Sequence, residues 1–255
     1  MEKLEKLLNG YQIYQDTERF QFGIDAVLLA DFASGGRAGD GGKSSIKAGE
    51  KVIDLGTGTG IIPLLMAGRL SSKTSGLCEP AFTGLEVQKD SADMAARSVA
   101  LNSLEGQIKI INGDLKDAEK LFARHSFNAV TCNPPYMIDA HGAGNELDAL
   151  TIARHEVLCT LEDVVAAADY LLASHGSFYM IHRPFRLPEI FSSLEKHKME
   201  MKRMRLIQPF ADKEPNLVLI EARKNAKRRL TVEPPLIVRN DDGEYSVEVQ
   251  NIYNR

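Results

Sequence analysis

The chain has 255 residues, 44% of them hydrophobic and 26% charged, which suits one α/β domain with small additions. Its net charge of −4 at pH 7 argues against a general nucleic-acid coat protein. The cysteines lack C-x-x-C spacing, so we expect no metal site. No apolar stretch reaches about 18 residues, so we expect no membrane span. The N-terminus is charged and does not resemble a signal peptide, so we expect a cytoplasmic location.

The first 50 residues predict a hairpin, a buried helix and a loop. Residues 11–22 alternate loosely between apolar and polar, as in a short hairpin, and 24–32 are apolar nearly all round, as in a buried helix. The Gly- and Ser-rich stretch 34–49 is a loop by composition. It contains Gly-Lys-Ser at 42–44 but lacks the flanking strand and helix of a phosphate-binding loop.

From Lys51 onward, short apolar runs alternate with segments of helical spacing. Strands are predicted at 51–55, 82–87, 108–111, 127–132, 177–181, 199–207 and 217–222, and helices at 61–70, 90–101, 117–122, 160–172 and 188–197. This alternation indicates an α/β, Rossmann-like fold with a seven-stranded, mostly parallel sheet and helices on both faces. Ligands of such sheets bind beyond the carboxyl ends of the strands.

The chain divides into three predicted parts. Residues 1–33 form the hairpin and helix, which we expect to pack on a ligand site, and 50–230 form the α/β domain. The remaining residues, 231–255, are predicted as a C-terminal β-hairpin appendage with a Gly-containing turn at 240–243.

A glycine-rich turn follows the first strand of the α/β domain. Asp54-Leu55 is followed by Gly56-Thr57-Gly58-Thr59-Gly60 and then directly by a helix. Glycines let the backbone approach a ligand closely, and a helix N-terminus favours a carboxylate. The dinucleotide fingerprint places its third glycine one residue later, at Ile61, whereas G-x-G-x-G after an acid is the first motif of class I methyltransferases. A purely structural glycine turn is the alternative.

Two acids at the ends of the next strands support a cofactor pocket. Glu86 ends the second strand and could accept hydrogen bonds from ribose hydroxyls, and Asp114 follows the third and could accept from an adenine amino group. Either acid alone is more simply an exposed strand-end carboxylate, but both in register favour S-adenosylmethionine as the cofactor. Thr57, Val87 and Leu115 are further predicted cofactor contacts.

The fourth strand ends in Asn133-Pro134-Pro135-Tyr136, the predicted catalytic residues. The Asn133 side-chain oxygen and the Pro134 carbonyl can each accept one hydrogen of a substrate NH2 group, and Tyr136 offers a face for base stacking. Two such acceptors select NH2 over a carbonyl and stabilise the charge that develops during transfer. Asn133 also borders the cofactor. A Pro-Pro turn that merely ends a strand is the structural alternative.

Together, Asp54–Gly60, Glu86, Asp114 and Asn133–Tyr136 resemble class I, N-P-P-Y methyltransferases. The segment Phe22-Gly-Ile-Asp-Ala-Val-Leu-Leu-Ala30 further resembles the N-terminal motif of the bacterial tRNA1(Val) adenine-N(6)-methyltransferase family, and the likeness runs from about Tyr11 to Ala222. It implies that 50–230 is the methyltransferase domain, that the substrate is the tRNA adenine just 3′ of the anticodon, and that Asp25 lies near the methionine part of the cofactor. Residues 154–156 (Arg-His-Glu) resemble a family segment without an assigned role.

Basic residues cluster between His182 and Leu230, within an otherwise acidic chain. This asymmetry is compatible equally with a polyanion-binding face and with a solvated lysine-rich surface. The residues proposed for phosphate contacts are Lys196, Lys202, Arg203, Lys224, Lys227, Arg228 and Arg229.

Other acceptors and one other class of function remain open at this point. The same chemistry could act on guanine or adenine amino groups of rRNA, on DNA adenine or on protein glutamine. DNA is less favoured because no DNA-recognition domain is evident, and glutamine because few residues precede the first strand. A non-catalytic protein that binds the cofactor and RNA is the alternative class, and a monomer is favoured.

Overall fold

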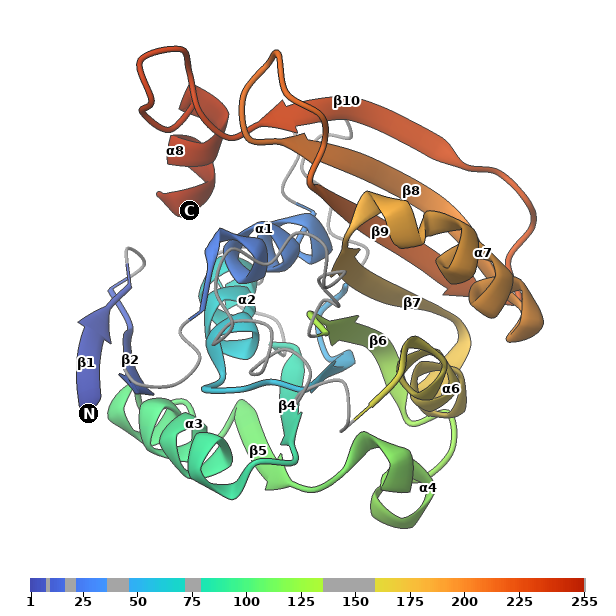
Figure 1. Cartoon of the computed structure of the whole chain (residues 1–255). Coiled ribbons are helices and arrows are strands. Elements are labelled where there is room, and N and C mark those ends of the chain that lie inside the picture. The colour runs from blue at the N-terminus through green and yellow to red at the C-terminus, as the bar shows by residue number, and fades with distance from the viewer. Residues whose placement is uncertain (8–9, 17–21, 36–45, 72–78, 135–158, 255) are drawn as a thin grey trace.

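Figure 1 shows the computed structural model, which describes residues 1–7, 10–16, 22–35, 46–71, 79–134 and 159–254. A two-stranded hairpin, β1 (Glu2–Lys6) and β2 (Gln12–Asp16), lies beside an eight-stranded sheet. The sheet contains β3 (Lys51–Leu55), β4 (Ala81–Glu86), β5 (Ile108–Asn112), β6 (Phe127–Cys132), β7 (Leu172–His182), β8 (Met199–Gln208), β9 (Leu217–Lys224) and β10 (Thr231–Ile237). The helices are α1 (Ile24–Ala33), α2 (Ile61–Ser71), α3 (Lys89–Leu101), α4 (Ala118–Leu121), α6 (Leu161–Leu171), α7 (Leu187–Lys196) and α8 (Val247–Tyr253), with 3-10 turns η2 (Leu115–Asp117) and η3 (Pro184–Arg186).

The sheet is mostly parallel, with the strand order β10-β8-β9-β7-β6-β3-β4-β5. Strands β3 to β7 run the same way, and only β9 is antiparallel to its neighbours. The carboxyl ends of β3, β4, β5, β6 and β7 therefore meet at one edge, which we call the carboxyl edge. This confirms the expected class of sheet, with eight strands rather than seven.

The helices cover both faces of the sheet (Figure 1), because alternate strand residues point to opposite sides. Val52 packs into one core with α1 and α2, whereas its neighbour Ile53 packs into a second core with α6 and α7. Both side chains are at most 1% exposed. Within the described residues, no helix is long and apolar enough to cross a membrane.

The expected C-terminal hairpin is present only as one antiparallel bridge, between Arg239 and Tyr245, around the turn at 240–243. Residues 231–237 form β10, an eighth strand parallel to β8, and 247–253 form a helix. The register of β10 shifts between Glu233 and Leu236, across two prolines that an edge strand tolerates because its outer side needs no N–H donor. The turn at 240–243 exists, but the chain after it starts α8, where the Ser246 hydroxyl accepts a hydrogen bond from the Val249 N–H.

The N-terminal hairpin and the short helix after β5 also differ in detail from the expectation. The hairpin pairs Glu2–Lys6 with Gln12–Asp16, so its first strand lies upstream of the predicted 11–22. The helix expected at 117–122 is a 3-10 turn, η2, followed by one turn of α-helix, α4.

Buried Arg69 joins the first and last helices to α2. Its guanidinium donates to the Val27 carbonyl of α1 (3.3 Å) and the Ile252 carbonyl of α8 (2.8 Å), and lies 3.6 Å from the Asp31 carboxylate. The side chains of Arg69 and Asp31 are 5% and 7% exposed, so this pair is shielded from water. The N-terminal and C-terminal segments are thus both bound to the α/β domain on the α1 side.

Candidate active site

Three glycines of the turn after β3 adopt left-handed backbone conformations. Gly56, Gly58 and Gly60 have φ of 69°, 58° and 86°, where residues with a Cβ are strained. A Cβ at Gly56 or Gly58 would meet nothing within 4 Å, so both face open space, whereas a Cβ at Gly60 would lie 3.2 Å from the Cβ of Ala95. The first two glycines leave room for a ligand, and the third allows the turn to pack closely against α3.

Glu86 is bound to this glycine turn. One carboxylate oxygen accepts from the Gly58 N–H (2.9 Å) and the other from the Gln88 N–H (2.8 Å). The residue is 6% exposed at the carboxyl end of β4. Each oxygen retains a further lone pair, so the carboxylate can hold the turn and still accept from a ligand hydroxyl.

Asp54 lies beneath the turn and is 2% exposed. The Thr131 hydroxyl of β6 donates to its Oδ1 (2.6 Å), while Oδ2 has no hydrogen-bond partner among the described residues. Burial raises the pKa of Asp54 to about 7, against the lowering effect of the Thr131 hydroxyl. A buried acceptor of this kind suits a cationic donor such as an ammonium group.

The carboxyl ends of β4 and β5 form the adjoining rim. Val87 is 40% exposed and presents an apolar surface there, and Leu115 is 9% exposed. Asp114 starts η2, with Oδ1 accepting from the Lys116 N–H (2.9 Å) and Oδ2 lying 3.4 Å from the Lys116 ammonium. Asn112 Nδ2 donates to the Glu86 and Val87 carbonyls (2.8 and 3.1 Å) and so fixes the two strand ends together.

The predicted acceptor residues continue β6 at the same edge. Asn133 is half-buried and Pro134 is buried, whereas Pro135, Tyr136 and residues 154–156 lie outside the described residues. Asn133 Nδ2 donates to Asp25 Oδ2 of α1 (3.2 Å). The structure therefore brings Asp25, the glycine turn, Glu86 and Asn133 to one edge of the sheet.

The sequence profile of the methyltransferase small domain family matches residues 43–202. This match covers more than half of the chain and includes the glycine turn, Glu86, Asp114 and Asn133. The chain belongs to this methyltransferase family.

Two similar proteins that align over most of their length carry the same name. A Porphyromonas gingivalis protein named tRNA1(Val) (adenine(37)-N6)-methyltransferase is 28% identical over 93% of this chain and 89% of its own. A Photobacterium profundum protein of the same name is 23% identical over 88% of this chain and 85% of its own.

Solved structures share the fold. A predicted O-methyltransferase from Agrobacterium tumefaciens has a TM-score of 0.67 at 22% identity, covering 90% of this chain and 95% of its own. An aTrm5 bound to tRNALeu has a TM-score of 0.56 at 13% identity, covering 88% of this chain and 53% of its own. At these identities the likeness concerns the class I methyltransferase fold alone.

Near the carboxyl edge lie further polar residues that the sequence had not singled out. Thr131 is internal to a strand, and Asn112 precedes the recognised acid, so neither carried a motif signal. His182 ends β7 next to β6, and its Nδ1 accepts from the Arg183 N–H (2.8 Å). Burial, together with the Arg186 charge, lowers the pKa of His182 to about 4, so its imidazole is neutral at pH 7.

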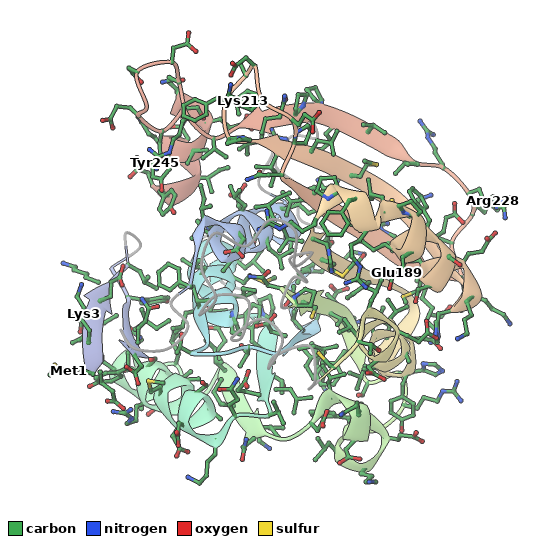
Figure 2. The ribbon with its side chains drawn as sticks, in the orientation of Figure 1. Met1, Lys3, Glu189, Lys213, Arg228 and Tyr245 are labelled. Carbon is green, nitrogen blue, oxygen red and sulfur yellow. The ribbon has the colours of Figure 1, made fainter. Side chains whose placement is uncertain are left out.

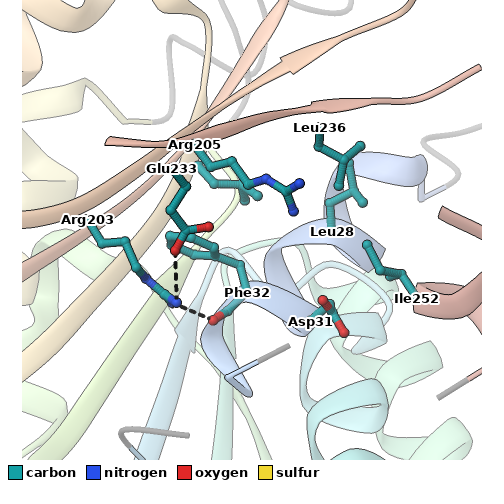
Figure 3. A pocket seen from close by; sticks show the side chains of 9 residues that line it. Leu28, Asp31, Phe32, Arg203, Arg205, Glu233, Leu236 and Ile252 are labelled. Carbon is teal, nitrogen blue, oxygen red and sulfur yellow. Dashed lines mark hydrogen bonds and ion pairs between the residues drawn. The ribbon is translucent and has the colours of Figure 1, made fainter. Parts of the chain in front are cut away.

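Two residues proposed for phosphate contacts are internal instead. The side chain of Arg203 is 14% exposed, and its guanidinium lies 3.1 Å from the Glu221 carboxylate and 3.3 Å from the Glu233 carboxylate. The same guanidinium donates a hydrogen bond to the Phe32 carbonyl and stacks on the Phe32 ring (Figure 3). Lys224 is 8% exposed and pairs with Asp169 at 2.8 Å. The Arg203 contacts join β8 to β9 and β10, and the Lys224 pair joins β9 to α6, so both residues are structural rather than RNA contacts.

The remaining basic residues lie away from the carboxyl edge. Lys196 pairs with Glu162, and Lys202 donates to the Lys227 carbonyl (2.8 Å). The exposed cluster 227–229 follows the end of β9, which runs antiparallel to β7 and so ends at the opposite edge of the sheet. Figure 2 shows this separation, with Arg228 and Lys213 at opposite ends of β8 and β9. At about 3.3 Å per residue, a six-residue strand separates the edges by about 20 Å.

Proposed function

We propose that this protein transfers a methyl group from S-adenosylmethionine to the exocyclic amino group of an adenine in tRNA. The observation that supports the proposal is the position of Asn133 and Pro134 after β6, the strand that pairs with β3, so they lie at the same carboxyl edge as the glycine turn and Glu86. One edge thus combines residues suited to the methyl donor with a pair of acceptors suited to an amino group.

The residues at this edge fit the cofactor. Gly56 and Gly58 leave open space, and the buried, unpartnered Oδ2 of Asp54 is available to the ammonium group of the methionine part. Glu86 retains lone pairs for the ribose hydroxyls, and Val87 offers an apolar contact for the adenine ring. S-adenosylmethionine supplies an electrophilic methyl group carried on a sulfonium, and we propose that these residues hold it.

Asn133 and Pro134 would act on the amino group that receives the methyl. Their two carbonyl oxygens accept its two hydrogens, which turns the nitrogen lone pair out of the plane of the base. The same oxygens stabilise the positive charge that grows on this nitrogen during transfer, and removal of one such preorganised partner typically costs about 10²–10³-fold in rate. The methylated cation then loses a proton to water, so positioning supplies most of the catalysis.

The acceptor is inferred from similar proteins. Those that align over most of this chain are named for adenine 37 of tRNA1(Val), and this supports the same nucleotide as the substrate. We further propose that the protein works as a monomer in the cytoplasm, where tRNA is found. The exposed cluster 227–229 would contact the body of the tRNA rather than its anticodon loop, because it lies at the opposite edge of the sheet.

The test is methylation in vitro with labelled S-adenosylmethionine. We expect label in a tRNA1(Val) transcript, recovered as N6-methyladenosine, and none in a transcript whose adenine 3′ of the anticodon is guanine. Asn133→Ala should lower turnover by about 10²-fold or more while the affinity for S-adenosylhomocysteine stays within about 3-fold. Label only in rRNA, DNA or a release factor would replace the tRNA proposal, and cofactor binding without any transfer would support a non-catalytic protein.

A further inference from the structure

The carboxylate of Asp25 uses its two oxygens for two different partners. Oδ1 accepts from the N–H of Ala26 (2.9 Å) in the first turn of α1, and Oδ2 accepts from Asn133 Nδ2 (3.2 Å). The first bond holds the carboxylate at the helix N-terminus, where the helix dipole also favours negative charge. The second bond connects α1 to the acceptor site across 108 residues of sequence.

Gly23 provides the space for this arrangement. A Cβ at residue 23 would lie 2.7 Å from Asp25 Oδ1, a separation that real Cβ atoms do not reach. The backbone of Gly23, with φ of −98° and ψ of −178°, is extended and open to any residue. Glycine at this position therefore leaves room for the Asp25 carboxylate, which a larger residue would displace. This accounts physically for the Gly-Ile-Asp order of the N-terminal motif.

We propose that Asp25 is a positioning residue that fixes the direction of the Asn133 amide. The NH2 and oxygen of an amide are nearly equal in size, so the group can be flipped with little change in packing. With Nδ2 donated to Asp25, the amide oxygen lies on the other side of the group. A flipped Asn133 would instead present NH2 to the substrate NH2, so two donors would face each other.

The proposal rests on the proposed function, because it assigns how that site selects an amino acceptor. A carboxylate accepts but cannot donate, so the Asp25 side chain matches only one of the two directions of the Asn133 amide. A hydrogen bond to a charged group is stronger than a neutral one, and its loss is worth about 10–100-fold in the population of the competent orientation. Asp25 thus contributes to turnover without touching the substrate.

The decisive experiment exchanges the polarity of the pair. Asp25→Asn should lower kcat about 10–100-fold, because the amide introduced at position 25 keeps its oxygen on the Ala26 N–H and turns its NH2 toward Asn133, which favours the flipped amide. Asn133→Asp should also be slow, because two carboxylates then face each other. In the double variant D25N/N133D, the amide at position 25 donates to the carboxylate at position 133, whose other oxygen can accept from the substrate. We expect the double variant to recover at least about 10-fold over either single variant.

Binding measurements separate positioning from folding. The affinity for S-adenosylhomocysteine and the KM for tRNA should change less than about 3-fold in all three variants. Gly23→Ala should reproduce the kcat loss of Asp25→Asn, because it displaces the carboxylate. Asp163→Asn is the matched control, since Asp163 is also a first-turn acid, caps only its own helix α6 through Thr160 and should leave kcat unchanged.

The outcomes are distinguishable. If wild-type protein methylates tRNA but the double variant is no faster than the slower single variant, Asp25 has only a structural role and the inference is wrong. The same conclusion holds if cofactor affinity falls as much as kcat. If wild-type protein transfers no methyl group to tRNA, the proposed function fails, and the inference fails with it.

Discussion

The buried carboxyl of Asp54 should make the protein less stable as the pH rises toward neutrality. Its pKa is 3.8 in an ordinary setting and about 7 in the folded protein, where burial disfavours the charged form. The folded state therefore binds more protons than the unfolded state between these two values. The free energy of unfolding falls with rising pH wherever the folded state binds more protons. The loss of stability therefore occurs between about pH 4 and pH 7 and is complete above about pH 7. The two pKa values correspond to about 4 kcal/mol.

Asp54→Asn isolates this effect. The introduced amide keeps an oxygen that can accept from the Thr131 hydroxyl and carries no charge at any pH. We would measure the free energy of unfolding by urea denaturation between pH 4.5 and 8 for both proteins. The wild-type value should fall relative to the variant by up to about 1.4 kcal/mol per pH unit across the window and level off near pH 7.5. A separation between the two proteins that does not change with pH would show that Asp54 is already ionised when folded, and would refute the reasoning.

Three further predictions concern the glycine turn, the buried arginine and the basic cluster. Gly60→Ala should destabilise the protein by about 1–2 kcal/mol more than Gly49→Ala: both residues have positive φ, of 86° and 75°, but only Gly60 faces a close neighbour. Equal losses in urea unfolding would show that the turn is not tightly packed. Arg69→Met should cost about 3–5 kcal/mol, because it removes the buried cation beside Asp31 and its hydrogen bonds to two backbone carbonyls. Arg97→Met, which breaks an exposed ion pair, should cost under about 1 kcal/mol, and similar losses in the two variants would contradict this. Neutralising the basic residues 227–229 should weaken the binding of whole tRNA and make the dependence of log K on log salt concentration shallower by about 0.9 per lost phosphate contact. A short anticodon stem-loop should be methylated at the same rate as by the wild-type protein. A slower reaction with the stem-loop would place the cluster near the active site.

The sequence predicted the central elements well because their signals are local. The strand at 51–55 is an apolar run that ends at a glycine, and its bounds agree with β3. The glycine turn could be recognised because only glycine tolerates its backbone, as the φ values of Gly56, Gly58 and Gly60 show. Glu86 and Asn133 were found because strand ends of a parallel sheet meet at one edge.

Features that depend on distant partners could not be predicted in this way. Strand β1 reads as charged, and its pairing with β2 is supported from α3 by the Arg97–Glu2 ion pair. Strand β10 follows a turn signal that looked like a local hairpin, but its partner is the open edge of β8. The bond between Asp25 and Asn133 joins residues that are 108 positions apart in the sequence.

Charged residues on strands were the least predictable. A basic residue in a strand faces water or the interior according to what covers that face of the sheet, and composition does not report this. Arg203 was expected on the surface, but Phe32, Glu221 and Glu233 enclose it. Lys227, in contrast, follows the end of β9 and remains exposed.

The bond from Arg69 to the Ile252 carbonyl bears on how the protein is made. During synthesis, α1 leaves the ribosome long before α8 exists, so the helix that carries Asp25 gains its last anchor only when residue 252 has emerged. A chain terminated before that point would retain the glycine turn and the N-P-P-Y residues while lacking this anchor. Removal of α8 should therefore loosen the packing of α1 while leaving the glycine turn in place.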